Sequence, residues 1–168
     1  MTDSPERHTD RTGTDRRPTW EWTELTDGVE IRFLGRAAAE VEPGELAQLL
    51  DPPPDAVSRL VQVHSDRVVE ATPGVAGEGD ALVSRASDLA LAVATADCVP
   101  VLLAGPDAIA AIHAGWRGLV ADVIARTLER LPNAGRLSAW IGPAIGACCY
   151  EVSSEVAERV AAASTSEI

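Results

Sequence analysis

The chain has 168 residues, of which 46% are hydrophobic, so we expect one packed domain rather than a disordered chain. Its 14 basic residues are all arginine and stand against 26 acidic residues, which gives a net charge of −12. This balance disfavours nucleic acid and anionic membranes as partners, because both require a basic face, and a small anionic substrate would need a local positive pocket.

The N-terminal segment is polar. Residues 1–19 hold four acidic and four basic groups and no hydrophobic segment of a secretory signal, which is typical of a disordered tail. A single domain is therefore expected over residues 20–168. Within it, Gly28–Arg36 predicts a first strand, and Glu42–Val57 predicts a short helix that ends at its proline run.

The middle of the chain predicts a series of strands. Arg59–Ala71 is typical of one strand, or of two strands separated by a polar step at His64–Arg67, and Gly79–Arg85 of a short strand. Asp88–Asp97 is a continuous apolar run, which predicts a strand buried on both faces. Val99–Ala104 and Asp107–Ala114 then predict a β-hairpin around a Gly-Pro-Asp turn.

The C-terminal part mixes helices with a strand. Apolar residues recur at helical spacing over four turns from Trp116 to Leu131, and the Pro-Asn pair that follows ends this helix. Arg136–Pro143 predicts a strand, and Glu155–Ala163 a last helix capped by Ser153 or Ser154. No membrane span is predicted, because no apolar run reaches the roughly 20 residues that a span needs.

Reactive side chains lie at the ends of the predicted strands. Cys98 follows the apolar run and precedes the hairpin, and His113 lies near the end of the second hairpin strand. A third candidate, His64, lies in "QVHSD", at the polar step between two predicted strands. A strand end is where a side chain can leave the core and face a cleft, so these three residues are candidates for a site.

The turn after His113 favours an anion. Gly115 and Gly118 remove side-chain bulk around the start of the predicted helix, where backbone N–H groups are free. Arg117 adds a positive charge at the same place. We therefore expect an anion such as phosphate to bind near Arg117.

Two chemistries fit these residues. Cys98 and His113 can act as a nucleophile and its base. Alternatively, His64, Cys98 and His113 can bind one metal ion, since two histidines and one cysteine leave a tetrahedral zinc with an open fourth position. The same ligands also accept copper. The spacings of 34 and 15 residues match no local zinc motif, so the residues alone leave both chemistries open.

Four motifs resemble a known family. "QVHSD", "TADCVPVLLA", "IHAGWRG" and "IGPAIGACCYEV" occur in this order and at separations similar to those of the bacterial laccase-domain family. Members of that family are described as polyphenol oxidases and as purine nucleoside phosphorylases. The resemblance runs from about Leu60 to Val152 and implies an α+β fold with mixed α/β/β/α layers, similar to the catalytic domain of cytotoxic necrotizing factor toxins.

The resemblance also implies a metal site and an activity. The family holds zinc through the histidine of QVH, the cysteine of ADC and the histidine of HAGWRG, which are His64, Cys98 and His113 in this chain. The implied activities are phosphorolysis of adenosine, inosine and methylthioadenosine, and deamination of adenosine. The implied partners are therefore a nucleoside and phosphate. Copper-dependent phenol oxidation is the older description.

The chain departs from the family pattern at both ends. Of the family's N-terminal signature only "FLGR" is present, so Arg36 is the expected counterpart of its substrate-binding arginine. Family members continue beyond the last predicted helix, whereas this chain ends at Ile168. We therefore expect a domain that is incomplete at the C-terminus, with a bare apolar surface that makes it marginally stable or is buried in a homodimer.

The leading hypothesis is a zinc-dependent purine nucleoside phosphorylase with adenosine deaminase activity. A cytoplasmic location is expected, because cysteines at 98, 148 and 149 do not form a disulfide framework. The alternatives are a copper-dependent polyphenol oxidase, a metal-free hydrolase built on Cys98 and His113, and an inactive truncated remnant. The chain has three histidines, one of them in the tail, which favours at most one metal ion.

Overall fold

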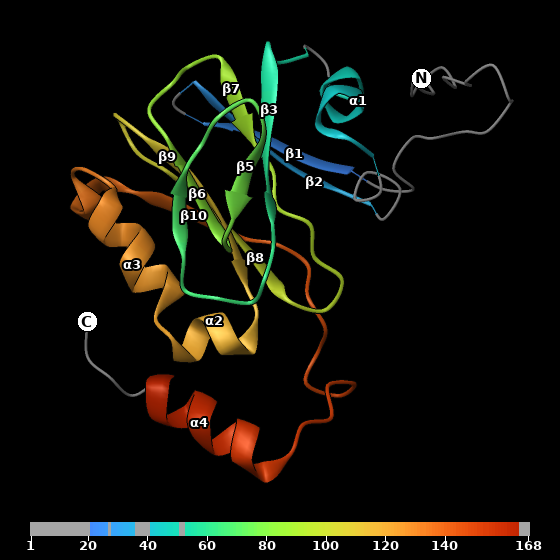
Figure 1. Ribbon diagram of the computed structural model, residues 1–168, viewed down its shortest axis with the longest axis vertical. Helices are drawn as coiled ribbons and strands as arrows, with labels where there is room; N and C mark the ends of the chain where they lie inside the picture. Colours follow the sequence, from blue (N-terminus) through green and yellow to red (C-terminus); the bar gives the residue numbers. More distant parts are fainter. Residues whose placement is uncertain (1–20, 27, 36–40, 51–52, 165–168) are drawn as a thin grey trace, which may run out of the picture.

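The computed structural model describes residues 21–26, 28–35, 41–50 and 53–164, and the elements in this part of the chain form three sheets and four α-helices (Figure 1). The strands are β1 (Glu21–Thr26), β2 (Val29–Leu34), β3 (Ala56–Val61), β4 (Val68–Glu70), β5 (Gly74–Glu78), β6 (Ala81–Ser84), β7 (Leu89–Leu91), β8 (Val99–Ala104), β9 (Ile109–Ala114) and β10 (Ser138–Ile141). The helices are α1 (Pro43–Gln48), α2 (Trp116–Val120), α3 (Val123–Arg130) and α4 (Ser154–Ser164).

The largest sheet has five strands in the order β10-β8-β9-β6-β4. Its strands pair antiparallel except for β4 with β6, which are parallel. A second sheet, in the order β5-β3-β7, is parallel throughout, and β1 and β2 form a separate antiparallel pair. The fold is therefore a mixed α/β arrangement, as the sequence predicts.

The two larger sheets lie between helices. On one side, α3 contacts β4, β6 and β9, and a cluster of buried apolar residues that includes Ile112 and Val123 fills the space between them. On the other side, α1 covers β3, and Leu46 packs against Val57. Leu82 points to the opposite face of β6 from its neighbours in the α3 cluster and is fully buried toward the second sheet. The order helix, sheet, sheet, helix agrees with the expected layers.

The predicted β8–β9 hairpin is confirmed. The two strands pair in register from Val99 opposite Ala114 to Ala104 opposite Ile109. Pro100 lies opposite His113, so the same register continued by one residue beyond the paired strands places Cys98 opposite Gly115. The open end of this hairpin therefore brings Cys98 close to His113.

The long strand expected over Asp88–Asp97 is wrong. Only Leu89–Leu91 forms a strand, β7. After it, the amide N–H of Ala92 donates to the carbonyl of Ser58, and the side-chain amide of Gln62 then both donates to and accepts from the backbone of Ala94. A side chain thus takes over the hydrogen bonds that a neighbouring strand would supply, and an apolar run alone does not distinguish the two cases.

The continuous helix expected from Trp116 to Leu131 is also wrong. The segment forms two helices, α2 and α3, separated at Asp122, whose φ of 65° and ψ of 35° are left-handed. The apolar periodicity continues through the break because Leu119, Ile124 and Leu128 all pack against the same core cluster. Periodicity therefore predicted the buried face correctly and missed the change of backbone direction.

Replacing Asp122 with alanine tests this break. We expect the free energy of unfolding to fall by about 1 kcal/mol, because the left-handed conformation is unfavourable for a residue with a Cβ and aspartate tolerates it better than alanine does. In a continuous helix the same change would instead stabilise the protein by about 0.5 kcal/mol through helix propensity. Urea denaturation measures the sign, with Glu129→Ala, an exposed position in regular helix, as the control.

Other predicted elements agree with the structure or fall outside the described part. The strands at Arg59–Ala71, Gly79–Arg85 and Arg136–Pro143 are present as β3 with β4, β6 and β10, and α4 begins where Ser153 accepts a hydrogen bond from the N–H of Val156 at 3.4 Å. Strands β1 and β5 are additional to those expected. The predicted tail at 1–19 and Arg36 lie outside the described residues. None of the helices that the structure describes has the length and apolar character needed to cross a bilayer.

Candidate metal centre

Three side chains from distant parts of the sequence meet at one point. One nitrogen of His64, the sulfur of Cys98 and one nitrogen of His113 all lie within 4.8 Å of one another. The Cys98 Sγ lies 3.9 Å from the His64 Nε2, and the two imidazole rings meet edge to face with their centroids 4.8 Å apart. Among the residues that the structure describes, this is the one group of three such ligands.

The hairpin and a crossing loop bring these residues together. His113 lies on β9, and Cys98 lies directly before β8, at the open end of the same hairpin. His64 lies in the loop from β3, in the three-stranded sheet, to β4 at the edge of the five-stranded sheet. Cys98 therefore precedes a strand and does not end one, which corrects the expected position and leaves its proximity to His113 unchanged.

Gly115 lies against all three ligands. A Cβ at this position would be 3.0 Å from the His64 Cδ2, 3.1 Å from the Cys98 Sγ and 3.7 Å from the His113 Cε1. The backbone of Gly115 is extended, with φ −75° and ψ 160°, which any residue can adopt. A side chain here would therefore press on the three side chains, and the reason is space rather than backbone conformation.

The donor set fits one metal ion. Ligands on a tetrahedral zinc lie about 3.5 Å from each other, so small rotations of these side chains suffice to bind zinc. Two imidazoles and a thiolate are also ligands that copper accepts. Gly115 has no side chain to press on the three donors.

A buried carboxylate that the sequence analysis missed supports the centre. Asp80 is fully buried at the start of β6, and its Oδ1 lies 2.8 Å from the Nδ1 of His113, which is itself only 3% exposed. The available signal was an acidic residue directly ahead of a short apolar strand in "GEGDALV". A charged residue in that position is unusual unless it is paired, because burial of an unpaired charge is costly.

The environment of Asp80 keeps its carboxylate charged. Burial by itself raises the pKa of Asp80, but hydrogen bonds from the Ser65 backbone, the His113 side chain, the Ser65 side chain and the His64 backbone together outweigh it, and the pKa lies below its usual value. An ionised carboxylate accepts hydrogen bonds only. His113 therefore donates through Nδ1 and leaves its Nε2 free.

The Cys98 thiol is not activated by its surroundings. Burial raises the pKa of this thiol, and the negative charges of Asp97 and Asp80 raise it further. A cysteine nucleophile needs the opposite, a lowered pKa that makes the thiolate available at neutral pH. This observation disfavours the Cys98–His113 hydrolase, whereas a metal ion would stabilise the thiolate directly if it bound here.

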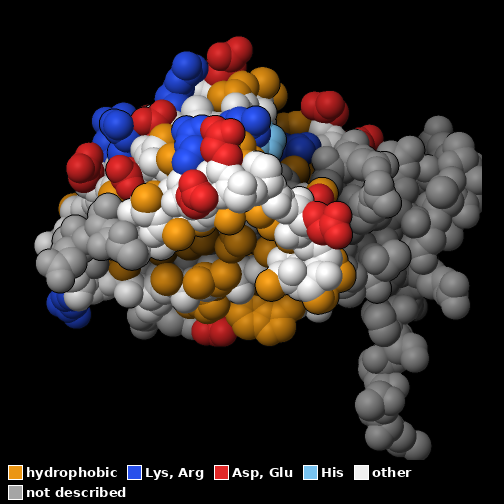
Figure 2. Space-filling view, turned by 90° about the horizontal axis from the view of Figure 1, so that it is seen from below, with side chains coloured by type: hydrophobic (Ala, Val, Ile, Leu, Met, Phe, Trp, Pro, Cys, Tyr) orange, Lys and Arg blue, Asp and Glu red, His pale blue; other side chains and the backbone are white. Residues whose placement is uncertain are grey.

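Arg117 follows His113 closely in the sequence, but its guanidinium group stacks on the ring of Trp116. Its side chain is exposed, and its guanidinium carbon lies 4.4 Å from the ring centroid of Trp116. Arg159 of α4 stacks on the same ring at 5.6 Å. On the face seen in Figure 2, blue basic side chains gather among red acidic ones. Helix α2 has only five residues, so its N-terminus alone supports no anion site and the predicted phosphate contact depends on Arg117.

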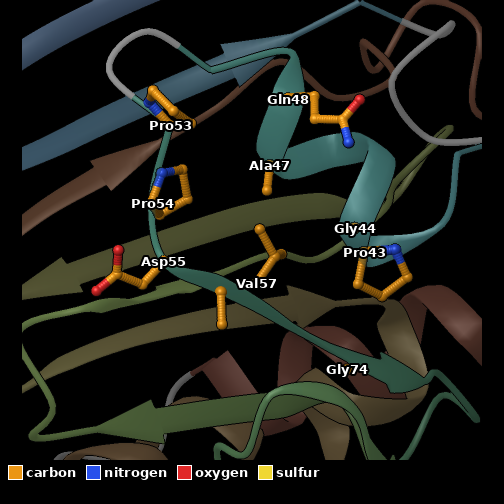
Figure 3. A pocket seen from close by; sticks show the side chains of 10 residues that line it. Pro43, Gly44, Ala47, Gln48, Pro53, Pro54, Asp55, Val57 and Gly74 are labelled. Atoms are coloured by element: carbon orange, nitrogen blue, oxygen red, sulfur yellow. The ribbon is translucent and has the colours of Figure 1, made fainter.

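Two surface pockets lie away from the three ligands. One lies between α1 and the start of β3, where Ala47 and Val57 face each other and Asp55 points away (Figure 3). The other lies between the β1–β2 pair and β10, and its lining is apolar: Trp22, Phe33, Ala139, Trp140, Ile141, Gly142 and Pro143. Neither is lined by His64, Cys98 or His113.

Comparison with known proteins identifies the family. Residues 36–167 match the family described as multi-copper polyphenol oxidoreductase laccase. The chain belongs to this family. The laccase-family resemblance predicted from the four motifs is therefore confirmed.

Several curated proteins similar to this chain are named purine nucleoside phosphorylases. The chain is 44% identical over 119 residues to a purine nucleoside phosphorylase of Deinococcus radiodurans, covering 67% of this chain and 47% of that protein. It is 39% identical over 104 residues to a purine nucleoside phosphorylase of Aquifex aeolicus, covering 58% of this chain and 50% of that protein. The chain thus spans about half the length of the curated relatives it matches.

Solved structures share the fold. A Neisseria meningitidis protein of the DUF152 family matches with a TM-score of 0.59 at 36% identity, covering 64% of this chain and 46% of that chain. YlmD from Geobacillus stearothermophilus matches with a TM-score of 0.60 at 27% identity, covering 68% of this chain and 49% of that chain. The mixed α/β fold with several sheets is therefore that of the DUF152 family.

Proposed function

We propose that the chain carries the metal centre of a zinc-dependent purine nucleoside phosphorylase, with adenosine deaminase as a second activity. The observation that carries the proposal is the meeting of His64, Cys98 and His113 in a chain whose curated relatives are named purine nucleoside phosphorylases. Bound zinc supplies Lewis-acid chemistry, including the activation of a water for attack on a purine ring.

The side chains of the chain itself have separate tasks in this proposal. The two histidines and Cys98 hold the metal ion, and Gly115 keeps the space beside them free. Arg117 binds the phosphate whose oxygen attacks the ribose C1′ while the glycosidic C–N bond breaks and the purine base leaves. Arg36 is a further substrate-binding residue in this proposal.

Phosphate-dependent release of adenine from adenosine is the direct test. The proposal predicts adenine only when both zinc and phosphate are present, and inosine when adenosine is incubated with zinc but no phosphate. If adenine release does not depend on phosphate, the phosphorylase assignment is wrong. The homodimer, expected from the bare surface at the incomplete C-terminus, also stays a prediction. The exposed side chains of Trp22 and Ile141 beside the apolar pocket are one apolar surface that it could bury.

Replacing Arg117 with alanine tests the phosphate contact. We expect the KM for phosphate to rise about tenfold, the effect of losing one charge-assisted hydrogen bond, while the KM for the nucleoside changes little. Arg159→Ala is the matched control, because it removes the other arginine from the same Trp116 ring. A similar rise for both variants would show that the stacked ring, rather than the Arg117 charge, is responsible.

A copper-dependent polyphenol oxidase is the second candidate, because the matched family is described as a multi-copper laccase. The two candidates differ in the metal that supports turnover. Protein loaded with copper should oxidise a phenol with consumption of oxygen if the second candidate is correct. Parallel assays of the zinc-loaded and copper-loaded protein on adenosine and on a phenol distinguish the two.

A further inference from the structure

One buried carboxylate is hydrogen-bonded to both histidine segments of the metal centre. The Oδ1 of Asp80 accepts hydrogen bonds from the backbone N–H of His64 at 2.9 Å and from the Nδ1 of His113 at 2.8 Å. The Oδ2 accepts from the backbone N–H of Val63 at 3.3 Å and from the N–H and hydroxyl of Ser65 at 2.6 and 2.8 Å. Because Asp80 has no exposed surface, bulk water cannot replace any of these five partners.

The first consequence concerns the His113 ring. A neutral imidazole carries its proton on one nitrogen and a lone pair on the other. Since the ionised Asp80 accepts and does not donate, the neutral form of His113 carries its proton on Nδ1 and its lone pair on Nε2. The carboxylate also fixes the rotation of the ring, which the main chain of β9 reinforces where the N–H of His113 donates to the Asp80 carbonyl at 2.7 Å.

The second consequence concerns the backbone of His64. Its φ of 58° lies in the left-handed region, which a non-glycine residue adopts only when its surroundings stabilise it. The N–H groups of Val63, His64 and Ser65 all point to the Asp80 carboxylate, which makes this turn an anion-binding concavity filled by a side chain of the protein itself. The strained turn directs His64 toward the other ligands.

We propose that Asp80 is the positioning residue of the metal centre, which presets the His113 tautomer and the His64 turn before any metal binds. The inference rests on the metal site of the proposed function. Asp80 touches neither substrate nor metal in this role and acts through the two histidines. Carboxylate partners of histidine ligands typically change metal affinity by about 10- to 100-fold.

Asp80→Asn is expected to change the tautomer of His113, because an asparagine side chain has only one oxygen that can accept hydrogen bonds. The asparagine has one accepting oxygen, and the Oδ2 position faces three donors, from Val63 and Ser65, so the oxygen must occupy it. The NH₂ group then occupies the Oδ1 position, where it donates to the Nδ1 of His113 and leaves the backbone N–H of His64 without its acceptor. The His113 proton consequently moves to Nε2, the nitrogen that must ligate the metal.

The experiment combines nitrogen-15 NMR of the histidine rings in the metal-free protein with zinc affinity measured by chelator competition. The wild-type chain should show His113 protonated at Nδ1, and Asp80→Asn should show it protonated at Nε2 with zinc affinity lower by about 10- to 100-fold. Cobalt absorption in the same variant reports altered coordination. Asp97→Asn is the charge-matched control, because it removes a carboxylate next to Cys98 without contacting a histidine, and zinc affinity should stay within about fivefold.

The outcomes separate this inference from the proposed function. If the wild-type chain binds zinc and His113 has the stated tautomer but no adenine is released from adenosine, the proposed function fails and the positioning role of Asp80 stands. A neutral wild-type His113 protonated at Nε2 and not at Nδ1 overturns the positioning role even where Asp80→Asn does not fold. Equal zinc affinity in the wild-type and Asp80→Asn proteins, or an equal loss in Asp97→Asn, also overturns it.

Discussion

Zinc binding is expected to fall by more than about 100-fold when Cys98 is replaced with alanine, and phosphorolysis is expected to fall to background. The change removes one of three ligands, and loss of a ligand exceeds the 10- to 100-fold effect of losing a partner of a ligand. The remaining histidine pair leaves two coordination positions to solvent. Competition with a chromophoric chelator and the adenine-release assay measure the two effects.

The control for Cys98→Ala is a second cysteine. Cys148 is exposed in the segment after β10 and does not belong to the group of three candidate ligands. Cys148→Ala should therefore leave zinc content and activity unchanged. Full activity of Cys98→Ala would rule out both the metal centre and the cysteine nucleophile, because each requires the sulfur of Cys98.

A single methyl group at Gly115 should lower activity about 100-fold without unfolding the protein. The added Cβ would lie 3.0 Å from the His64 Cδ2 and 3.1 Å from the Cys98 Sγ, which is closer than ordinary contact. His64 is exposed and can move, so the ligands shift rather than the core, and a displacement of about 1 Å at a catalytic group can cost 100-fold in rate. The free energy of unfolding should fall by only about 1 kcal/mol, since alanine is a poorer N-cap than glycine.

Gly44→Ala is the matched control for Gly115→Ala. Gly44 lies in α1, and a Cβ there meets no atom within 4 Å. The substitution should leave zinc affinity unchanged and stabilise the helix slightly. If Gly115→Ala retains wild-type zinc affinity and rate, the three side chains do not act as one centre.

The hairpin that carries Cys98 and His113 could be predicted because its signals are local. Two apolar segments separated by a Gly-Pro-Asp turn define both strands, and strand alternation then places His113 on a defined face. The motif resemblance identified the family for the same reason. Each motif is a short continuous stretch of residues and can be recognised without knowledge of the fold. His64 was a candidate from its polar flanks, but its distance to the hairpin was not available from any local pattern.

Both errors concern the path of the backbone within segments whose apolar pattern was identified correctly. The run from Asp88 to Asp97 is apolar throughout, yet the Gln62 amide and not a strand satisfies the backbone of Ala94. The helix after Gly115 keeps its apolar spacing across the left-handed Asp122. In both cases the hydrophobic pattern reports which face is buried, and burial does not determine the path of the backbone.

The sequence by itself determined the apolar segments, the hairpin turn and the three ligand types, since these depend on residue identity and short spacing. The tertiary structure decided that the three candidate ligands meet, that Gly115 lies against all three, and that Asp80 is hydrogen-bonded to the backbone of His64 and to the ring of His113. Asp80 is 16 residues from His64 and 33 from His113. Hydrogen bonds across such separations form only after the two sheets pack, because only packing excludes the water that otherwise solvates a carboxylate.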